Sequence, residues 1–170
     1  MRPGGGKAKG ASFEREVCVA LSLWVSDGAS EDLFWRSAMS GGRSTRGAKA
    51  GKDLRRQAGD ISAVSAEGCS LTDRFYIECK HVKDLGIASF FLKRTGPLSK
   101  FWHVAMTEAI LHRKQPMLIA RQNLMPAFVL TYVGETPGAA GYQPDARFFD
   151  CDLTLLHVML ARKYAAPIQQ

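Results

Sequence analysis

The sequence predicts one domain of mixed α/β or α+β class, on three observations. The chain has 170 residues, a length at which a single domain buries a core without disulfides. Apolar residues recur at helical spacing in three segments, and short apolar runs of strand length lie between them. Hydrophobic residues make up 46% of the chain and charged residues 23%, which excludes a wholly disordered or collagen-like protein.

The first predicted helix runs from Ser12 to about Val25, because apolar residues recur at helical spacing and Ser12 can cap its first turn. Residues 1–10 contain several glycines and two lysines, which predicts a flexible basic arm. Three strand-like runs follow the helix, and a turn at residues 66–73 is expected between the last two. These runs are Leu33–Met39, Ile61–Ser65 and Arg74–Lys80.

The second half of the chain alternates in the same way. After Gly96-Pro97, apolar residues from Trp102 to Ile110 show a helical period. Strands are expected at residues 117–120 and 127–133, then a loop at 134–144 and a final helix between Leu153 and Tyr164. We therefore expect a single domain over residues 11–165, followed by a short tail at 166–170.

The positive charge is concentrated in one segment. Lys and Arg number 23 against 16 Asp and Glu, which gives a net charge of +7 and favours an anionic partner. Residues 36–56 carry seven of the positive charges and one negative charge, among glycines and without periodic apolar residues. We expect a mobile basic loop at 40–57 that contacts the phosphates of an anionic partner, with a solvated linker as the alternative. Its predicted contact residues are Ser40, Arg43, Arg46, Lys49, Lys52, Arg55 and Arg56, and Arg121 elsewhere in the chain can also reach a phosphate.

Two other classes of protein are disfavoured by the sequence. The four cysteines form no CxxC pair, so a zinc site of the usual spacing is not expected. No stretch approaches the roughly 20 apolar residues of a membrane span, and residues 1–10 lack the apolar core of a signal peptide. We expect reduced thiols, a cytoplasmic protein and no contact with a membrane.

Charged residues at strand ends form the best candidate for a catalytic site. Gly59-Asp60 opens the second predicted strand, and Glu78-Cys79-Lys80 closes the third. Side chains alternate along a strand, so Glu78 and Lys80 share one face. If Asp60 begins the adjacent strand, its carboxylate can meet Glu78 and form a site for a hard divalent cation. Lys80 would then hold a water or stabilise charge on a phosphate, although a surface salt bridge between Glu78 and Lys80 is the alternative.

This pattern resembles the PD-(D/E)xK nuclease signature. Asp60 and Glu78-x-Lys80 carry the resemblance, and Gly59 stands where the signature has proline. The first helix, from Lys9 to Glu16, resembles that of archaeal-type Holliday junction resolvases and related phage nucleases. The resemblance covers about residues 9–121. It implies a restriction-endonuclease-like core of helix, three-strand meander, helix and strand, with a C-terminal strand and helix added.

The resemblance also implies an activity. It implies an Mg²⁺-dependent endonuclease, with Mn²⁺ able to substitute, that cleaves branched or otherwise structured DNA as a homodimer in phage or mobile-element DNA processing. The bacterial cytoplasm, for a bacterial or a phage-encoded protein, is the expected place of action. Glu14, Asp60, Glu78 and the Cys79 carbonyl would hold the metal, while Lys80 assists the attacking water. A restriction-like or repair nuclease and a non-catalytic DNA-binding module are the alternatives.

Overall fold

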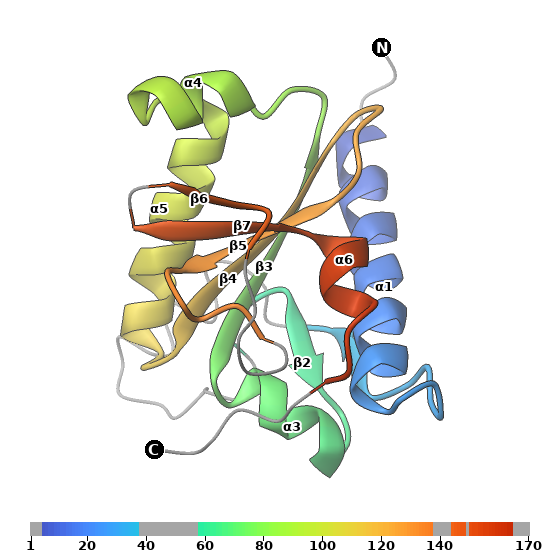
Figure 1. Cartoon of the computed structure of the whole chain (residues 1–170). Helices are drawn as coiled ribbons and strands as arrows, with labels where there is room; N and C mark the ends of the chain where they lie inside the picture. The colour runs from blue at the N-terminus through green and yellow to red at the C-terminus, as the bar shows by residue number, and fades with distance from the viewer. Residues whose placement is uncertain (1–4, 38–57, 138–143, 149, 165–170) are drawn as a thin grey trace.

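The structure is a computed structural model that describes residues 5–37, 58–137, 144–148 and 150–164. Its helices in these ranges are α1 (Gly5–Val25), α3 (Ala66–Thr72), α4 (Ile87–Lys93), α5 (Pro97–Leu111) and α6 (Leu156–Leu160). Its strands are β1 (Phe34–Arg36), β2 (Ile61–Ala63), β3 (Phe75–Val82), β4 (Gln115–Gln122), β5 (Phe128–Tyr132), β6 (Ala146–Phe148) and β7 (Cys151–Leu155). Figure 1 shows these elements in one view.

The main sheet has five strands in the order β3-β4-β5-β7-β6. Strands β3 and β4 run parallel, with Glu78 opposite Leu118, and the other neighbours are antiparallel. Strands β1 and β2 form a separate antiparallel pair. Asp60, directly before β2, lies at the free edge of β3, where its amide donates a hydrogen bond of 2.8 Å to the Ile77 carbonyl.

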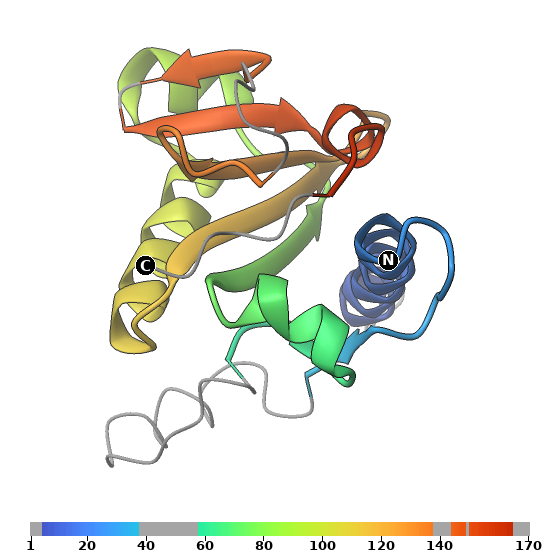
Figure 2. The same cartoon turned by 60° about the horizontal axis from the view of Figure 1, so that its bottom comes forward.

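Helices cover both faces of the main sheet (Figures 1 and 2). Helix α1 packs Phe13, Val17 and Leu21 against one face, which is formed by alternate residues such as Ile77 and Met117. Helix α5 covers the other face with a second apolar cluster. That cluster includes Trp102, Ala105, Leu118, Ala120 and Leu130. The alternation of Met117 with Leu118 along β4 therefore fills two separate cores.

The mixed α/β class is confirmed, and the order of elements agrees with a restriction-endonuclease-like core. Three local predictions are wrong. Helix α1 begins at Gly5 rather than at Ser12, so residues 5–10 of the expected arm are helical, because Lys7, Ala8 and Lys9 favour a helix. The expected turn at residues 66–73 is helix α3, since the Ser65 hydroxyl accepts a hydrogen bond from the Gly68 amide and caps it.

The third difference lies near the C-terminus. Leu153, expected in the last helix, lies in β7, and α6 begins only at Leu156. Leu153 is in a strand rather than in the helix because it pairs with β5, where it lies opposite Leu130. Helix α4, which the sequence did not predict, lies between the left-handed residues Gly86 and Arg94. Among the described residues, none of the helices combines the length and apolarity that crossing a bilayer requires.

Candidate active site

Strand β3 places Tyr76, Glu78 and Lys80 on the face that α5 covers. Phe75, Ile77 and Cys79 point into the α1 core, as the strand alternation predicted. The Tyr76 hydroxyl donates to Glu78 Oε2 at 3.3 Å, and the Lys80 ammonium donates to Glu78 Oε1. One oxygen of Glu78 is thus held by a neutral donor and the other by a cation.

Asp60 lies beside the same strand, at the start of β2. Its Oδ2 accepts a hydrogen bond of 2.9 Å from the Cys79 amide and lies 3.7 Å from the Lys80 ammonium. Its own carbonyl accepts a hydrogen bond of 2.8 Å from the Ser37 amide. The structure therefore brings Asp60, Glu78 and Lys80 together, with both carboxylates in contact with one ammonium.

Gly59 is what allows the chain to approach β3 this closely. Its φ is +85°, in the left-handed region, and a Cβ at this position would lie 2.5 Å from the Ile77 carbonyl oxygen. Proline fixes φ near −65°, so it cannot adopt this conformation. The glycine that departs from the sequence signature is therefore required by the local backbone.

Burial and charge shape the protonation of the site. Asp60 and Glu78 are each only 8% exposed. Burial, and then repulsion from Glu78, raises the pKa of Asp60 to about 7. Burial alone would lower the pKa of Lys80, but the charges of Glu78 and Asp60 outweigh it and raise that pKa, so Lys80 stays an ammonium. Burial, followed by the charge of Glu78, also raises the pKa of Tyr76, which remains a neutral donor.

Helix α1 supplies a third carboxylate near this group. Glu14 is largely buried and forms an ion pair with Arg36 of β1, with 2.5 Å between Oε2 and Nε. Its charge also contributes to the raised pKa of Asp60, less than burial and the charge of Glu78 do. Arg36 was noted in the sequence only as part of a basic segment. Its pairing with Glu14 joins residues 22 positions apart, which no local pattern indicates.

Glu16 of α1 forms an ion pair with Arg121 of β4. Arg121 donates to both oxygens of Glu16, and its guanidinium lies 4.6 Å from the centre of the Phe13 ring. The hydrogen bond to Arg121, opposed by burial, lowers the pKa of Glu16. Arg121, which we predicted to contact DNA, therefore joins β4 to α1 in this structure.

The family of the chain follows from a comparison with protein-family models. Residues 5–139, which include every residue of the site described above, match the family described as "Phage putative PDDEXK endonuclease". The chain belongs to this family. No curated protein and no solved structure matches it. A PDDEXK endonuclease is a nuclease that acts on DNA, and such enzymes generally use divalent metals.

The oxygen donors of this PDDEXK endonuclease suit a hard divalent cation. The charge of Glu78 helps to raise the pKa of Asp60, so a cation between these two buried carboxylates would relieve their repulsion, and the Cys79 carbonyl adds a neutral oxygen. In the described part of the chain, no group of three or more Asp, Glu, His or Cys side chains is close enough to hold a metal. Asp60 and Glu78 are thus a pair of carboxylates rather than a closed metal cluster, and Glu14, paired with Arg36, is a third carboxylate near them.

Tyr76, which contacts Glu78, was not predicted as a site residue from the sequence. Its position two residues before Glu78 on the same strand face is the signal that could have found it. The basic loop predicted to contact DNA lies outside the described residues. That set comprises Ser40, Arg43, Arg46, Lys49, Lys52, Arg55 and Arg56.

Proposed function

We propose that this PDDEXK endonuclease is an Mg²⁺-dependent, structure-selective enzyme that hydrolyses phosphodiester bonds of branched DNA, in the manner of a Holliday junction resolvase. The observation that supports the proposal best is the arrangement of Asp60, Glu78 and Lys80 at the edge of β3. We assign these residues to the acidic and lysine positions of the signature. The assignment gives each of them a chemical role.

Asp60, Glu78, the Cys79 carbonyl and Glu14 are the residues that would hold the metal, with Mn²⁺ able to replace Mg²⁺. When bound, the metal supplies positive charge that stabilises the phosphate and the leaving oxygen during hydrolysis. The Tyr76 hydroxyl fixes the orientation of the Glu78 carboxylate. Because Lys80 remains protonated, it donates hydrogen bonds to the attacking water or to a phosphate oxygen rather than accepting a proton.

Symmetric cutting of a branched substrate requires two active sites, so we propose a homodimer. Its place of action is the cytoplasm of a bacterial host, in the processing of phage or mobile-element DNA. The basic loop at residues 40–57 supplies phosphate contacts along the arms of the substrate.

Cleavage of a substrate panel tests this proposal. Labelled duplex, flap, single-stranded and four-way DNA are incubated with Mg²⁺ and the wild-type protein, Asp60→Asn, Glu78→Gln or the control Glu67→Gln. Glu67 is an exposed residue in the first turn of α3, outside the proposed set of metal ligands. We expect wild type and control to cut the four-way substrate fastest, and the two site variants to lose cleavage with DNA binding intact or stronger, since each loses a charge that repels phosphate.

Lys80→Ala should lose cleavage as well, yet calorimetry should still detect Mg²⁺ binding. Cleavage by Asp60→Asn or Glu78→Gln near the wild-type rate would show that the site is wrongly assigned. Equal cleavage of plain duplex and branched DNA would favour a restriction-like or repair nuclease. Binding of DNA without any cleavage would indicate a non-catalytic module.

A further inference from the structure

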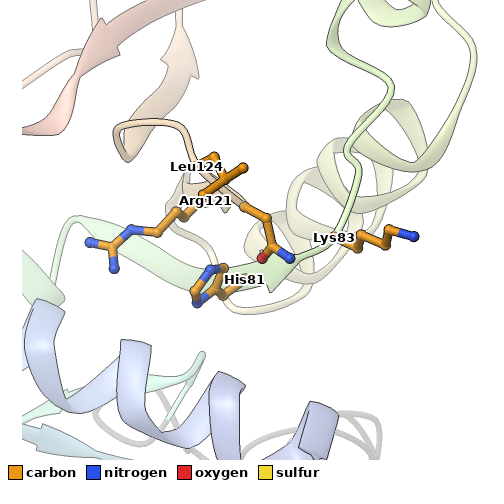
Figure 3. A pocket seen from close by; sticks show the side chains of 5 residues that line it. His81, Lys83, Arg121 and Leu124 are labelled. Carbon is orange, nitrogen blue, oxygen red and sulfur yellow. The ribbon is translucent and has the colours of Figure 1, made fainter. Parts of the chain in front are cut away.

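A second surface lies at the carboxyl ends of β3 and β4, on the side of the sheet that α1 covers. It is an open pocket of about 620 Å³ (Figure 3). His81 follows Lys80 on β3 but points to the opposite face, where its ring centre lies 5.4 Å from that of Phe13. The pocket is lined by His81, Lys83, Arg121, Asn123 and Leu124.

The pocket has a positive electrostatic character. Figure 3 shows Arg121 and Lys83 extending to opposite sides of His81, and the Lys9 ammonium donates a hydrogen bond to Asn123. Burial, followed by the charges of Lys9 and Arg121, lowers the pKa of His81. Because Glu16 neutralises the charge of Arg121, the positive charges at this pocket that could bind an anion are those of Lys83, which lines it, and Lys9, which contacts Asn123.

The pocket is bordered by the tip of the β4–β5 hairpin, where an apolar side chain projects into solvent. Leu124 is 106% exposed relative to its reference state, and its φ of +63° lies in the left-handed region. Both features disfavour leucine, since asparagine or glycine adopts this conformation more easily and exposes no apolar surface. Met125 beside it is also exposed, at 42%.

The tip is held firmly on both sides. The Asn123 amide donates to the Val82 carbonyl at 3.1 Å, and the Gln122 side chain accepts a hydrogen bond of 2.8 Å from the Leu85 amide. The Met125 amide closes the turn onto the Gln122 carbonyl at 3.2 Å. These bonds hold the backbone around Leu124 in place beside Lys83 and Lys9. The left-handed conformation and the exposure of Leu124 destabilise the fold, and among the described residues no contact of its side chain offsets this.

We propose that this pocket and tip form a second DNA contact, in which Lys9 and Lys83 bind backbone phosphates and Leu124 inserts as an apolar wedge at a branch point. The inference rests on the proposed function, because it specifies how that enzyme recognises its substrate. Apolar side chains inserted between base steps unstack and kink DNA, and insertion costs least where stacking is already interrupted. The cations favour a nucleic acid over a membrane interior or an apolar protein surface.

Binding measured without divalent metal tests the wedge separately from cutting. Fluorescence anisotropy compares a four-way junction with a duplex of the same arm length. Leu124→Asn should weaken junction binding by about 10-fold and duplex binding by less than about 2-fold, because only the junction offers open base faces. The matched control Ile110→Gln removes another exposed apolar side chain, 70% exposed on α5, and should change neither affinity.

The phosphate contacts predict a different pattern. Lys83→Gln should weaken both DNAs alike and reduce the slope of log affinity against log salt by about 0.9 on duplex arms. Lys163→Gln, an exposed lysine near the carboxyl end of α1, is the control and should leave the slope unchanged. Leu124→Asn should keep or raise the melting temperature, by about 2–4 °C, since it relieves the left-handed leucine. If Leu124→Asn lowers the melting temperature, the same binding measurements are made with Leu124→Gly.

The outcomes separate the two proposals. Binding with the expected junction preference, but no cleavage after Mg²⁺ is added, would contradict the proposed function alone. Cleavage with an unchanged junction-to-duplex ratio in Leu124→Asn would contradict the wedge alone. Conversion of a dimer to a monomer by Leu124→Asn, seen in sedimentation, would show that the tip contacts a second copy of the chain and would overturn its role on DNA.

Discussion

Gly59 provides a sharp test of how the site is built, because Gly28 is its natural control. Both glycines are left-handed, with φ of +85° and +86°. A Cβ on Gly59 would lie 2.5 Å from the Ile77 carbonyl oxygen, whereas a Cβ on Gly28 would meet nothing within 4 Å. Gly28→Ala therefore measures backbone strain, and Gly59→Ala measures the same strain with a steric clash added.

The magnitudes follow from these contacts. Gly28→Ala should reduce the free energy of unfolding by about 1–2 kcal/mol, the penalty for a left-handed L-residue. Gly59→Ala also pushes the chain off Ile77 and so threatens the buried Asp60–Ile77 hydrogen bond. Its total loss should be about 2–5 kcal/mol, since an unsatisfied buried backbone group costs about 1–3 kcal/mol. At about 2–4 °C per kcal/mol, the melting temperatures should differ clearly.

Urea unfolding and DNA cleavage measure the two consequences. Gly59→Ala should also lose cleavage because Asp60 directly follows it, while Gly28→Ala should keep near wild-type activity. Gly59→Pro, which restores the proline of the signature, should be worse than Gly59→Ala because proline cannot reach a positive φ. Equal stability losses in the two alanine variants, or an active Gly59→Pro, would refute the close approach of Gly59 to β3.

Three further predictions concern charges. The pKa of Asp60 is raised to about 7, so its contribution to the stability of the fold is complete below the unfolded pKa of about 3.9 and is lost as the pH rises through 7. Without divalent metal, the melting temperature of Asp60→Asn should therefore rise relative to that of the wild type between about pH 4 and pH 8. A difference in melting temperature that stays constant with pH would contradict the raised pKa. Glu14→Gln should slow single-turnover cleavage at saturating Mg²⁺ by about 10²-fold or more, and Glu16→Gln should have little effect; the reverse result would mean that the wrong carboxylate was assigned. Neutralising four charges of the basic loop should reduce the salt slope of duplex binding by up to about 3.6, and an unchanged slope would mark the loop as a linker. These four are Arg43, Arg46, Lys49 and Lys52.

The sequence predicted those parts of the fold that depend on periodic side chains. Helices α1 and α5 and the alternation of Glu78 with Cys79 follow directly from apolar spacing. Helix α3 has only seven residues, too few for a period, and Gly68 is needed there because a Cβ would lie 2.9 Å from the Leu33 carbonyl oxygen. That contact, like the pairing that makes Leu153 part of a strand, joins distant segments and leaves no local pattern.

The edge of β3 shows how Asp60 comes to lie beside Cys79 and Lys80. An edge strand presents unpaired amides and carbonyls that invite another strand to pair. Here Asp60 satisfies two of these groups, since its amide donates to the Ile77 carbonyl and its carboxylate accepts from the Cys79 amide. Asp60 therefore occupies this part of the edge through both its backbone and its carboxyl group, and the neighbouring Lys80 side chain is 29% exposed. The lysine and the Leu124 pocket lie on opposite faces of the same strand, because Lys80 and the pocket residue His81 are consecutive in β3.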